Sequence, residues 1–225
     1  GKRVLLVDAD PQRDLTASHG WNGDTLEKSL GRLMYLATQD SMPSVKDTIL
    51  HHEEGMDVLP SNLDLSSMES QLVNAMSREK LLSLLLRDVK KDYDYILLDC
   101  SPSLGMITIN ALTAADSVII PVQTQYLPAK GMTQLLRSIN MVRTHTNEHL
   151  KIGGIVMTLV DGRTNLAKEV ISTIRTNYGM SIRIFDAQIP VAVKAAEAAK
   201  EGKSIFSYDA NSRPAEIKEK KAFQD

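Results

Sequence analysis

The chain comprises 225 residues, of which 43% are hydrophobic and 24% are charged. These fractions are typical of globular domains and argue against disordered and fibrous classes. The formal net charge is −2, so contact with nucleic acid would depend on a local basic patch rather than on the charge of the whole chain.

The single cysteine, Cys100, excludes a disulfide within the chain and cannot alone supply a cysteine-based metal or iron–sulfur site. One cysteine fits a reducing cytoplasm, which is the expected location. No apolar run approaches the ~20 residues of a membrane-spanning helix. The length is ordinary for one α/β domain, so we expect residues 1–225 to form a single domain.

Short segments rich in Val and Ile alternate along the chain with longer segments of helical period. This alternation predicts an α/β fold, a mostly parallel twisted sheet flanked by helices on both faces. The expected strands are residues 3–8, 56–59, 95–99, 117–122, 154–158 and 182–186. The expected helices are residues 63–73, 78–90, 107–114, 129–144, 165–178 and 193–201. Residues 21–52 indicate two short helices and a loop, and residues 217–225 indicate the start of a further helix.

Two of the expected strands end in acidic residues. The first reads VLLVDADPQ, with Asp8 and Asp10, and the other reads YDYILLDCSPS, with Asp99. Ligands of parallel α/β sheets bind beyond the carboxyl ends of the strands, and Mg²⁺ takes one or two carboxylates while keeping several waters. Two alternatives stay open. Asp99 can instead cap the next turn, and Asp8 can bind a ribose, although the glycine-rich turn that ribose binding requires is absent upstream.

Four long blocks stand in one order along the chain. They read GKRVLLVDADPQ, YDYILLDCSPSLGMITINALTAADSVIIPVQTQYLPAKGMTQLL, GGIVMTLVDGRTNLAKEVISTIR and IPVAVKAAEAAKEGKSIFSYDANSRPA. Together they resemble the ParA/Soj-like partition ATPases, which belong to the MinD-like, deviant-Walker branch of the P-loop NTPase superfamily. The resemblance covers nearly the whole chain and implies a MinD/ParA-like fold that binds ATP and Mg²⁺.

The resemblance also implies roles for individual residues. Asp10 matches the acid that helps to position Mg²⁺ and the attacking water, so it is the expected catalytic residue, with Asp8 beside it in the cofactor site. Asp99 matches the Walker B acid, which binds Mg²⁺ through water. Thr158 and Pro190 match positions beside the adenine, although they could instead be a strand end and a turn former. Phosphoryl transfer needs an oriented water and charge compensation, which these acids and the metal would supply.

Several members of this family bind DNA without sequence preference as ATP-bound dimers, and a ParB-like centromere-binding protein stimulates hydrolysis. Arg163 and Lys194 match two of the DNA-binding positions, where accumulated positive charge suffices for phosphate contacts. Val191 stands where relatives commonly carry an arginine, so the chain lacks one of the family's basic residues directly after Pro190. The implied function is ATP-dependent plasmid or chromosome partition by a cytoplasmic, nucleoid-associated homodimer that does not bind membranes.

The phosphate loop that defines the family, approximately KGGVGKTT, has no counterpart in these 225 residues. We therefore expect a fragment without the first strand and phosphate loop, which would not bind ATP alone. The alternative is a degenerate relative without nucleotide that acts as a DNA- or partner-binding module. A MinD-like site selector is a further alternative, although residues 217–225 show no apolar face of the size that a membrane helix needs.

Overall fold

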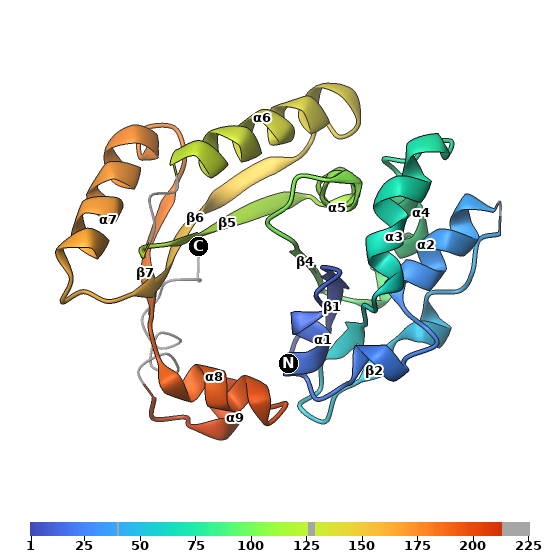
Figure 1. The fold of residues 1–225 in the computed structure, drawn as a ribbon, viewed down its shortest axis with the longest axis horizontal. Helices are drawn as coiled ribbons and strands as arrows, with labels where there is room; N and C mark the ends of the chain where they lie inside the picture. The colour runs from blue at the N-terminus through green and yellow to red at the C-terminus, as the bar shows by residue number, and fades with distance from the viewer. Residues whose placement is uncertain (40, 126–128, 213–225) are drawn as a thin grey trace. The chain divides into compact units, whose positions relative to one another are not determined.

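The computed structural model describes residues 1–39, 41–125 and 129–212. Contacts within the chain divide it into two compact units, each with its own sheet (Figure 1). Unit 1 comprises Gly1–Ala115 and Ser138–Leu150, and unit 2 comprises Asp116–Arg137 and Lys151–Asp225. The expectation that both units form one domain stays a prediction.

The sheet of unit 1 has four strands in the order β2-β3-β1-β4. Strand β1 is parallel to both of its neighbours, β3 and β4, whereas the short strand β2 pairs antiparallel with β3. The strands are β1 (Val4–Ala9), β2 (Leu50–His51), β3 (Asp57–Leu59) and β4 (Tyr95–Cys100). A central strand of a parallel sheet is buried, which explains the almost continuous apolar sequence of β1.

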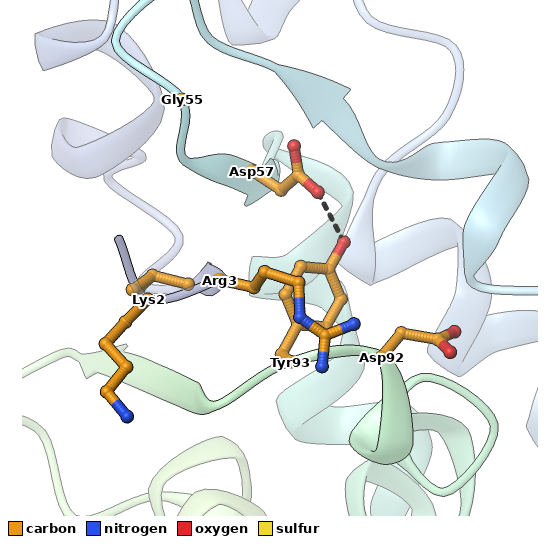
Figure 2. A pocket seen from close by; sticks show the side chains of 7 residues that line it. Lys2, Arg3, Gly55, Asp57, Asp92 and Tyr93 are labelled. Atoms are coloured by element: carbon orange, nitrogen blue, oxygen red, sulfur yellow. Dashed lines mark hydrogen bonds between the residues drawn. The ribbon is translucent and has the colours of Figure 1, made fainter.

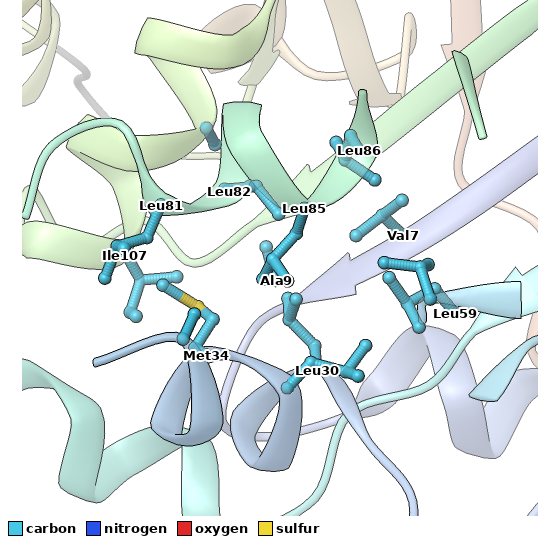
Figure 3. Packing of buried hydrophobic residues seen from close by; sticks show 14 of the residues in the cluster. Val7, Ala9, Leu30, Met34, Leu59, Leu81, Leu82, Leu85, Leu86 and Ile107 are labelled. Atoms are coloured by element: carbon cyan, nitrogen blue, oxygen red, sulfur yellow. The ribbon is translucent and has the colours of Figure 1, made fainter. Parts of the chain in front are cut away.

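Helices cover one face of this sheet. They are α2 (Leu30–Thr38), α3 (Asp64–Gln71), α4 (Leu81–Leu86) and α5 (Met106–Ala114). The short helix α1 (Asp14–Ser18) follows the end of β1, and 3₁₀ turns lie at Gly23–Thr25, Lys46–Thr48, Leu72–Asn74 and Lys90–Asp92. Alternate residues of β1, including Val7 and Ala9, are buried with Leu30 of α2 and Leu85 of α4 in one apolar core (Figure 3). The period of two along the strand thus directs every second side chain into the core.

The other face of β4 is more open. Tyr95 and Leu97, which alternate with the core-facing residues, are 55% and 54% exposed. Within the described ranges, no strand pairs with the second edge of β4. Strand β4 is therefore an edge strand of its sheet, which places the acid at its carboxyl end beside a single neighbouring strand, β1.

Unit 2 contains a three-stranded parallel sheet in the order β5-β6-β7. Its strands are β5 (Ser117–Gln123), β6 (Lys151–Val160) and β7 (Ile184–Pro190). Its helices are α7 (Asn165–Tyr178), α8 (Val193–Lys200) and α9 (Ile205–Tyr208). Helix α6 (Ala129–His145) contributes residues to both units. The Thr164 hydroxyl accepts the Ala167 N–H at 3.2 Å and caps α7. At Gly154, with φ +153°, a Cβ would lie 2.8 Å from the Phe185 ring, so glycine permits the close pairing of β6 and β7.

All six expected strands are present, and the α/β class with parallel sheets and flanking helices is confirmed. The prediction of one sheet is wrong for the described residues, because the strands form two separate sheets. Helix α4 is shorter than the expected helix at 78–90 because Ser77, with φ +50°, precedes it and a 3₁₀ turn follows it. The helix expected at 217–225 lies outside the described residues. Among the helices of the described ranges, none has the length and apolar character needed to cross a membrane.

Candidate functional site

The acids of the two strand ends lie at the same edge of the sheet in unit 1. Strands β1 and β4 run parallel, and Asp8 is directly opposite Asp99 in their register. Asp10 follows the last residue of β1 and begins the turn into α1. Three carboxylates thus gather at the carboxyl edge of the sheet, where parallel α/β sheets bind their ligands.

Asp8 is fully buried and directed into the protein. Its Oδ2 atom accepts two hydrogen bonds from Thr16, one from the backbone N–H at 2.8 Å and one from the hydroxyl at 2.5 Å. Its Oδ1 atom accepts the Asp10 N–H at 3.2 Å. A buried carboxylate needs such partners, and these bonds fix the backbone that carries Asp10.

Asp10 differs from Asp8 because it is only partly buried. Its Oδ1 atom accepts the Gln12 N–H at 2.9 Å, and its carbonyl accepts the Arg13 N–H at 2.9 Å. Arg13 has a left-handed backbone, with φ +56°, and its guanidinium pairs with Asp24 at 2.6 Å. The turn therefore has a fixed shape and leaves the second carboxylate oxygen of Asp10 for a ligand.

The electrostatics of the strand ends favour a cation. Burial raises the pKa of Asp8, and the hydrogen bonds from Thr16 oppose that rise. The pKa of Asp99 is also raised, first by loss of solvent at the strand end and then by the negative charges of Asp8 and Asp10. Since the carboxylates repel one another, a divalent cation would relieve the repulsion.

The residues fit Mg²⁺ better than a metal held by protein groups alone. Among the described residues, no group of three or more His, Cys, Asp or Glu side chains is arranged to hold a metal ion. Mg²⁺ usually keeps several waters and binds through one or two carboxylates together with phosphate oxygens. Asp10 and Asp99 fit that mode, in which the ion would supply charge compensation for a bound phosphate group.

Two of the expected nucleotide-binding residues lie in unit 2. Thr158 stands near the end of β6, where its carbonyl accepts the Thr124 N–H at 3.2 Å. Pro190 is the last residue of β7 and pairs in register with Val160. Both are partly buried at the carboxyl edge of the same sheet. Contact with adenine stays a prediction.

The two expected DNA-binding residues follow the same edge of unit 2. Arg163 lies in the loop after β6, and its guanidinium donates to both carboxylate oxygens of Asp161 at 2.9 Å. Lys194 lies in the first turn of α8 and donates to Glu197 at 2.8 Å. The guanidinium of Arg163 lowers the pKa of Asp161 to about 2. Each cation is thus exposed but carries a carboxylate partner from its own segment.

A pocket lies at the opposite end of the strands in unit 1. Its lining includes Lys2 and Arg3 before β1, Asp57 at the start of β3, and Asp92 and Tyr93 before β4 (Figure 2). Positive and negative side chains are equally represented in this group. Because the pocket is at the amino ends of the strands, it is separate from the edge that carries Asp8, Asp10 and Asp99.

Sequence reasoning missed three functional candidates. Thr16 binds Asp8, while Asp161 and Glu197 pair with the expected DNA-binding cations. Glu197 lies three residues after Lys194 within α8, which is a recognisable helical spacing for an ion pair. No spacing rule links Thr16 to an acid eight residues earlier, so only the folded turn reveals that bond.

Comparisons with known proteins give a consistent answer. A sequence model of the family described as "AAA domain" matches residues 1–152. The chain is 41% identical to the sporulation initiation inhibitor protein Soj of Bacillus subtilis, over 96% of this chain and 83% of that protein. It is 36% identical to the chromosome partitioning protein ParA of Caulobacter vibrioides, over 93% of this chain and 77% of that protein.

A solved structure extends the similarity to three dimensions. The structure of cobyrinic acid a,c-diamide synthase from Mycobacterium smegmatis, with bound ATP analog and magnesium, is similar with a TM-score of 0.79 and 37% identity. The similarity covers 89% of this chain and 80% of that one. That relative therefore binds a nucleotide and magnesium on the same type of fold.

Parallel sheets flanked by helices, with acids at the carboxyl edge, define the class of the molecule as an α/β protein of the nucleotide-binding P-loop type. Within this class, the chain belongs to the ParA/Soj family of partition ATPases.

One expectation from the sequence finds no support in these comparisons. The 225 residues contain no G-x-x-x-x-G-K-[ST] sequence, and we expected the chain to lack a first strand and phosphate loop for that reason. The family model, however, matches from residue 1 onward.

Proposed function

We propose that this protein hydrolyses Mg²⁺-ATP and uses the hydrolysis cycle to segregate plasmid or chromosomal DNA. The observation that carries the proposal is the register of β1 and β4, which sets Asp8 opposite Asp99 and leaves the partly buried Asp10 at the same sheet edge. The name of the ParA relative, a chromosome partitioning protein, supports partition as the purpose of hydrolysis.

In the proposed reaction, Asp10 holds and orients the attacking water beside the γ-phosphate. Asp99 binds the hydration shell of Mg²⁺, and the ion compensates the charge on the phosphates when it is bound. Thr158 and Pro190 contact the adenine at the edge of unit 2. Asp8 belongs to the same site, opposite Asp99 in the register of β1 and β4.

The proposed cycle includes DNA and a protein partner. With ATP bound, the protein forms a homodimer that contacts nucleoid DNA through Arg163 and Lys194, in the cytoplasm. A ParB-like centromere-binding protein stimulates hydrolysis and thereby releases the DNA. Both cations are exposed on the segments that follow β6 and β7, which suits contact with phosphates along a duplex.

The test uses the purified protein as its gene encodes it. Hydrolysis of Mg²⁺-ATP is measured alone, with DNA of random sequence, with a ParB-like protein, and with both. We expect slow basal hydrolysis that rises when both are present. DNA binding without hydrolysis or ATP binding under any of these conditions would instead establish a nucleotide-free DNA-binding module.

A second candidate function follows from the similarity to the cobyrinic acid a,c-diamide synthase structure, at 37% identity. The same ATPase measurement distinguishes this synthase activity from partition. Hydrolysis that depends on cobyrinic acid and an amide donor, and not on DNA, would favour the synthase activity over partition.

A further inference from the structure

Thr16 lies at the centre of a buried hydrogen-bond network that extends beyond its own turn. Its hydroxyl donates to Asp8 and accepts the Ser61 N–H at 3.0 Å, and its backbone N–H also donates to Asp8. The side chains of Thr16, Asp8 and Ser61 have no exposed surface. The hydroxyl therefore joins the acidic turn after β1 to the segment that follows β3.

The far end of the network is itself anchored. The carbonyl of Pro60 accepts the Leu30 N–H at 2.8 Å, at the start of α2. The Ser29 hydroxyl, which caps that helix, donates to Asn62 at 2.8 Å. Because α2 belongs to the apolar core, Ser61 has a fixed position and offers Thr16 a rigid donor.

The near end of the network leads to Asp10. The Oδ1 atom of Asp8 accepts the Asp10 N–H at 3.2 Å, while both bonds from Thr16 end on Oδ2. Rotation of the Asp8 carboxylate would move the backbone of Asp10 with it. Thr16 prevents this rotation, since it donates to the same oxygen from two directions.

We propose that Thr16 is a positioning residue for ATP hydrolysis, which fixes the Asp8 carboxylate and through it the catalytic Asp10. This inference rests on the proposed function. It assigns Asp8 a role inside the protein rather than direct contact with the cofactor, since Asp8 is fully buried and both of its oxygens accept protein N–H or O–H groups.

Threonine is the residue type that this position requires. Its hydroxyl supplies one donor and an acceptor at the same atom, and both are used. Valine has nearly the same shape but neither the hydrogen-bond donor nor the acceptor, while serine keeps the hydroxyl and loses only a methyl group. Substitution by valine and by serine thus separates hydrogen bonding from packing.

The experiment compares T16V and T16S in the full protein, with kcat and KM for Mg²⁺-ATP measured for each. A catalytic group displaced by about 1 Å can cost about 100-fold in rate, so we expect T16V to lower kcat by about 10- to 100-fold with KM changed less than about threefold. T16S should restore kcat to within about threefold of the wild type. A purely structural role would lower the melting temperature without this split between kcat and KM.

S61A is the matched control. Ser61 is buried beside Thr16, but within the described residues its hydroxyl has no hydrogen-bond partner, and only its backbone N–H enters the network. S61A should therefore keep the wild-type kcat. An equal loss of kcat in S61A and T16V, or in T16S and T16V, would overturn the proposal.

If T16V does not fold, D8N tests the positioning role instead. The positioning role predicts a lower kcat with an unchanged KM for D8N, whereas a higher KM with kcat unchanged would assign Asp8 to direct cofactor binding and overturn the inference. Wild-type kcat in T16V would also reject it. If the wild-type protein itself does not hydrolyse ATP, the proposed function fails, and the inference fails with it.

Discussion

Two aspartates two positions apart have different environments in this protein. Asp8 is fully buried with both oxygens hydrogen-bonded, while Asp10 is only partly buried and, within the part of the chain that the structure describes, keeps one oxygen without a protein partner. The strand VLLVDA explains the difference, since Asp8 is still within β1 and Asp10 is beyond its end. Burial therefore separates a structural carboxylate from one that can meet a ligand.

Tyr93 provides a pH-dependent test at the same scale. Its hydroxyl donates to Asp57 at 2.6 Å (Figure 2). The carboxylate of Asp57 also contacts the His51 ring at 2.6 Å. Burial and then the bond to Asp57 raise the pKa of Tyr93 above its usual value of 10.0. The unfolded chain thus loses this proton at lower pH than the folded protein, so stability is lost as pH rises above about 10.

We expect Y93F to reduce the fall in unfolding free energy between pH 8 and pH 10.5, measured by urea titration. At pH 8 the variant should be less stable by about 0.5–1.5 kcal/mol, the net value of one hydrogen bond. Y178F is the control, because Tyr178 makes no side-chain hydrogen bond within the described ranges. An identical pH dependence in Y93F and the wild type would contradict the assignment.

At the scale of elements, the N-termini of α5 and α4 are each capped by a polar side chain from another helix instead of by a residue at the helix's own start. Glu69 of α3 accepts the N–H groups of Met106 and Ile107 at 2.7 and 3.1 Å, because Gly105 at the start of α5 has no side chain to cap it. Asn110 of α5 accepts the Leu82 N–H at 3.1 Å at the start of α4. These contacts fix how α3, α4 and α5 pack.

Removal of the Asn110 side chain should therefore destabilise unit 1. Its amide also donates to the carbonyl of Arg78 at 2.7 Å, and the side chain is fully buried. N110A leaves buried backbone groups without partners, so we expect a loss of about 1–3 kcal/mol in urea unfolding. N140A, at an exposed position of α6, should change stability little, and equal losses in both variants would contradict this account.

The elements that sequence periodicity predicts best are those with long, regular patterns. Helix α7 has the predicted bounds, Asn165–Tyr178, because its apolar stripe and the Thr164 cap agree. Strand β2 has only two residues and no pattern to detect. The shorter α4 could not be predicted either, since Asn110, 28 residues further along, supplies the bond at its start.

At the scale of the whole molecule, the sequence predicted the strands but not their division into two sheets. Pairing partners depend on which strand edges meet, and periodicity carries no information on edges. The sequence indicates the acids Asp8, Asp10 and Asp99 because each lies at or just beyond the carboxyl end of an apolar strand. Thr16 was missed because its role depends on a contact with the distant Ser61.

The net charge of −2 makes DNA binding a local property. Removal of Arg163 and Lys194 together should lower the slope of log K against log salt for random DNA by about 2, with one unit for each phosphate contact. K151A, at the amino end of β6, should leave the slope nearly unchanged. The slope is measured by filter binding across a salt series. An unchanged slope in the double variant would show that neither Arg163 nor Lys194 contacts DNA phosphates.

The central claim is that Asp10 acts in hydrolysis rather than in binding. Its most direct test is single-turnover hydrolysis of Mg²⁺-ATP by wild-type protein, D10N and D14N, with ATP affinity measured in parallel. Asp14 is exposed in the first turn of α1 and serves as the control. The account predicts that D10N binds ATP within about threefold of the wild type but hydrolyses it at least about 100-fold more slowly, while D14N behaves like the wild type. Wild-type hydrolysis by D10N would contradict it.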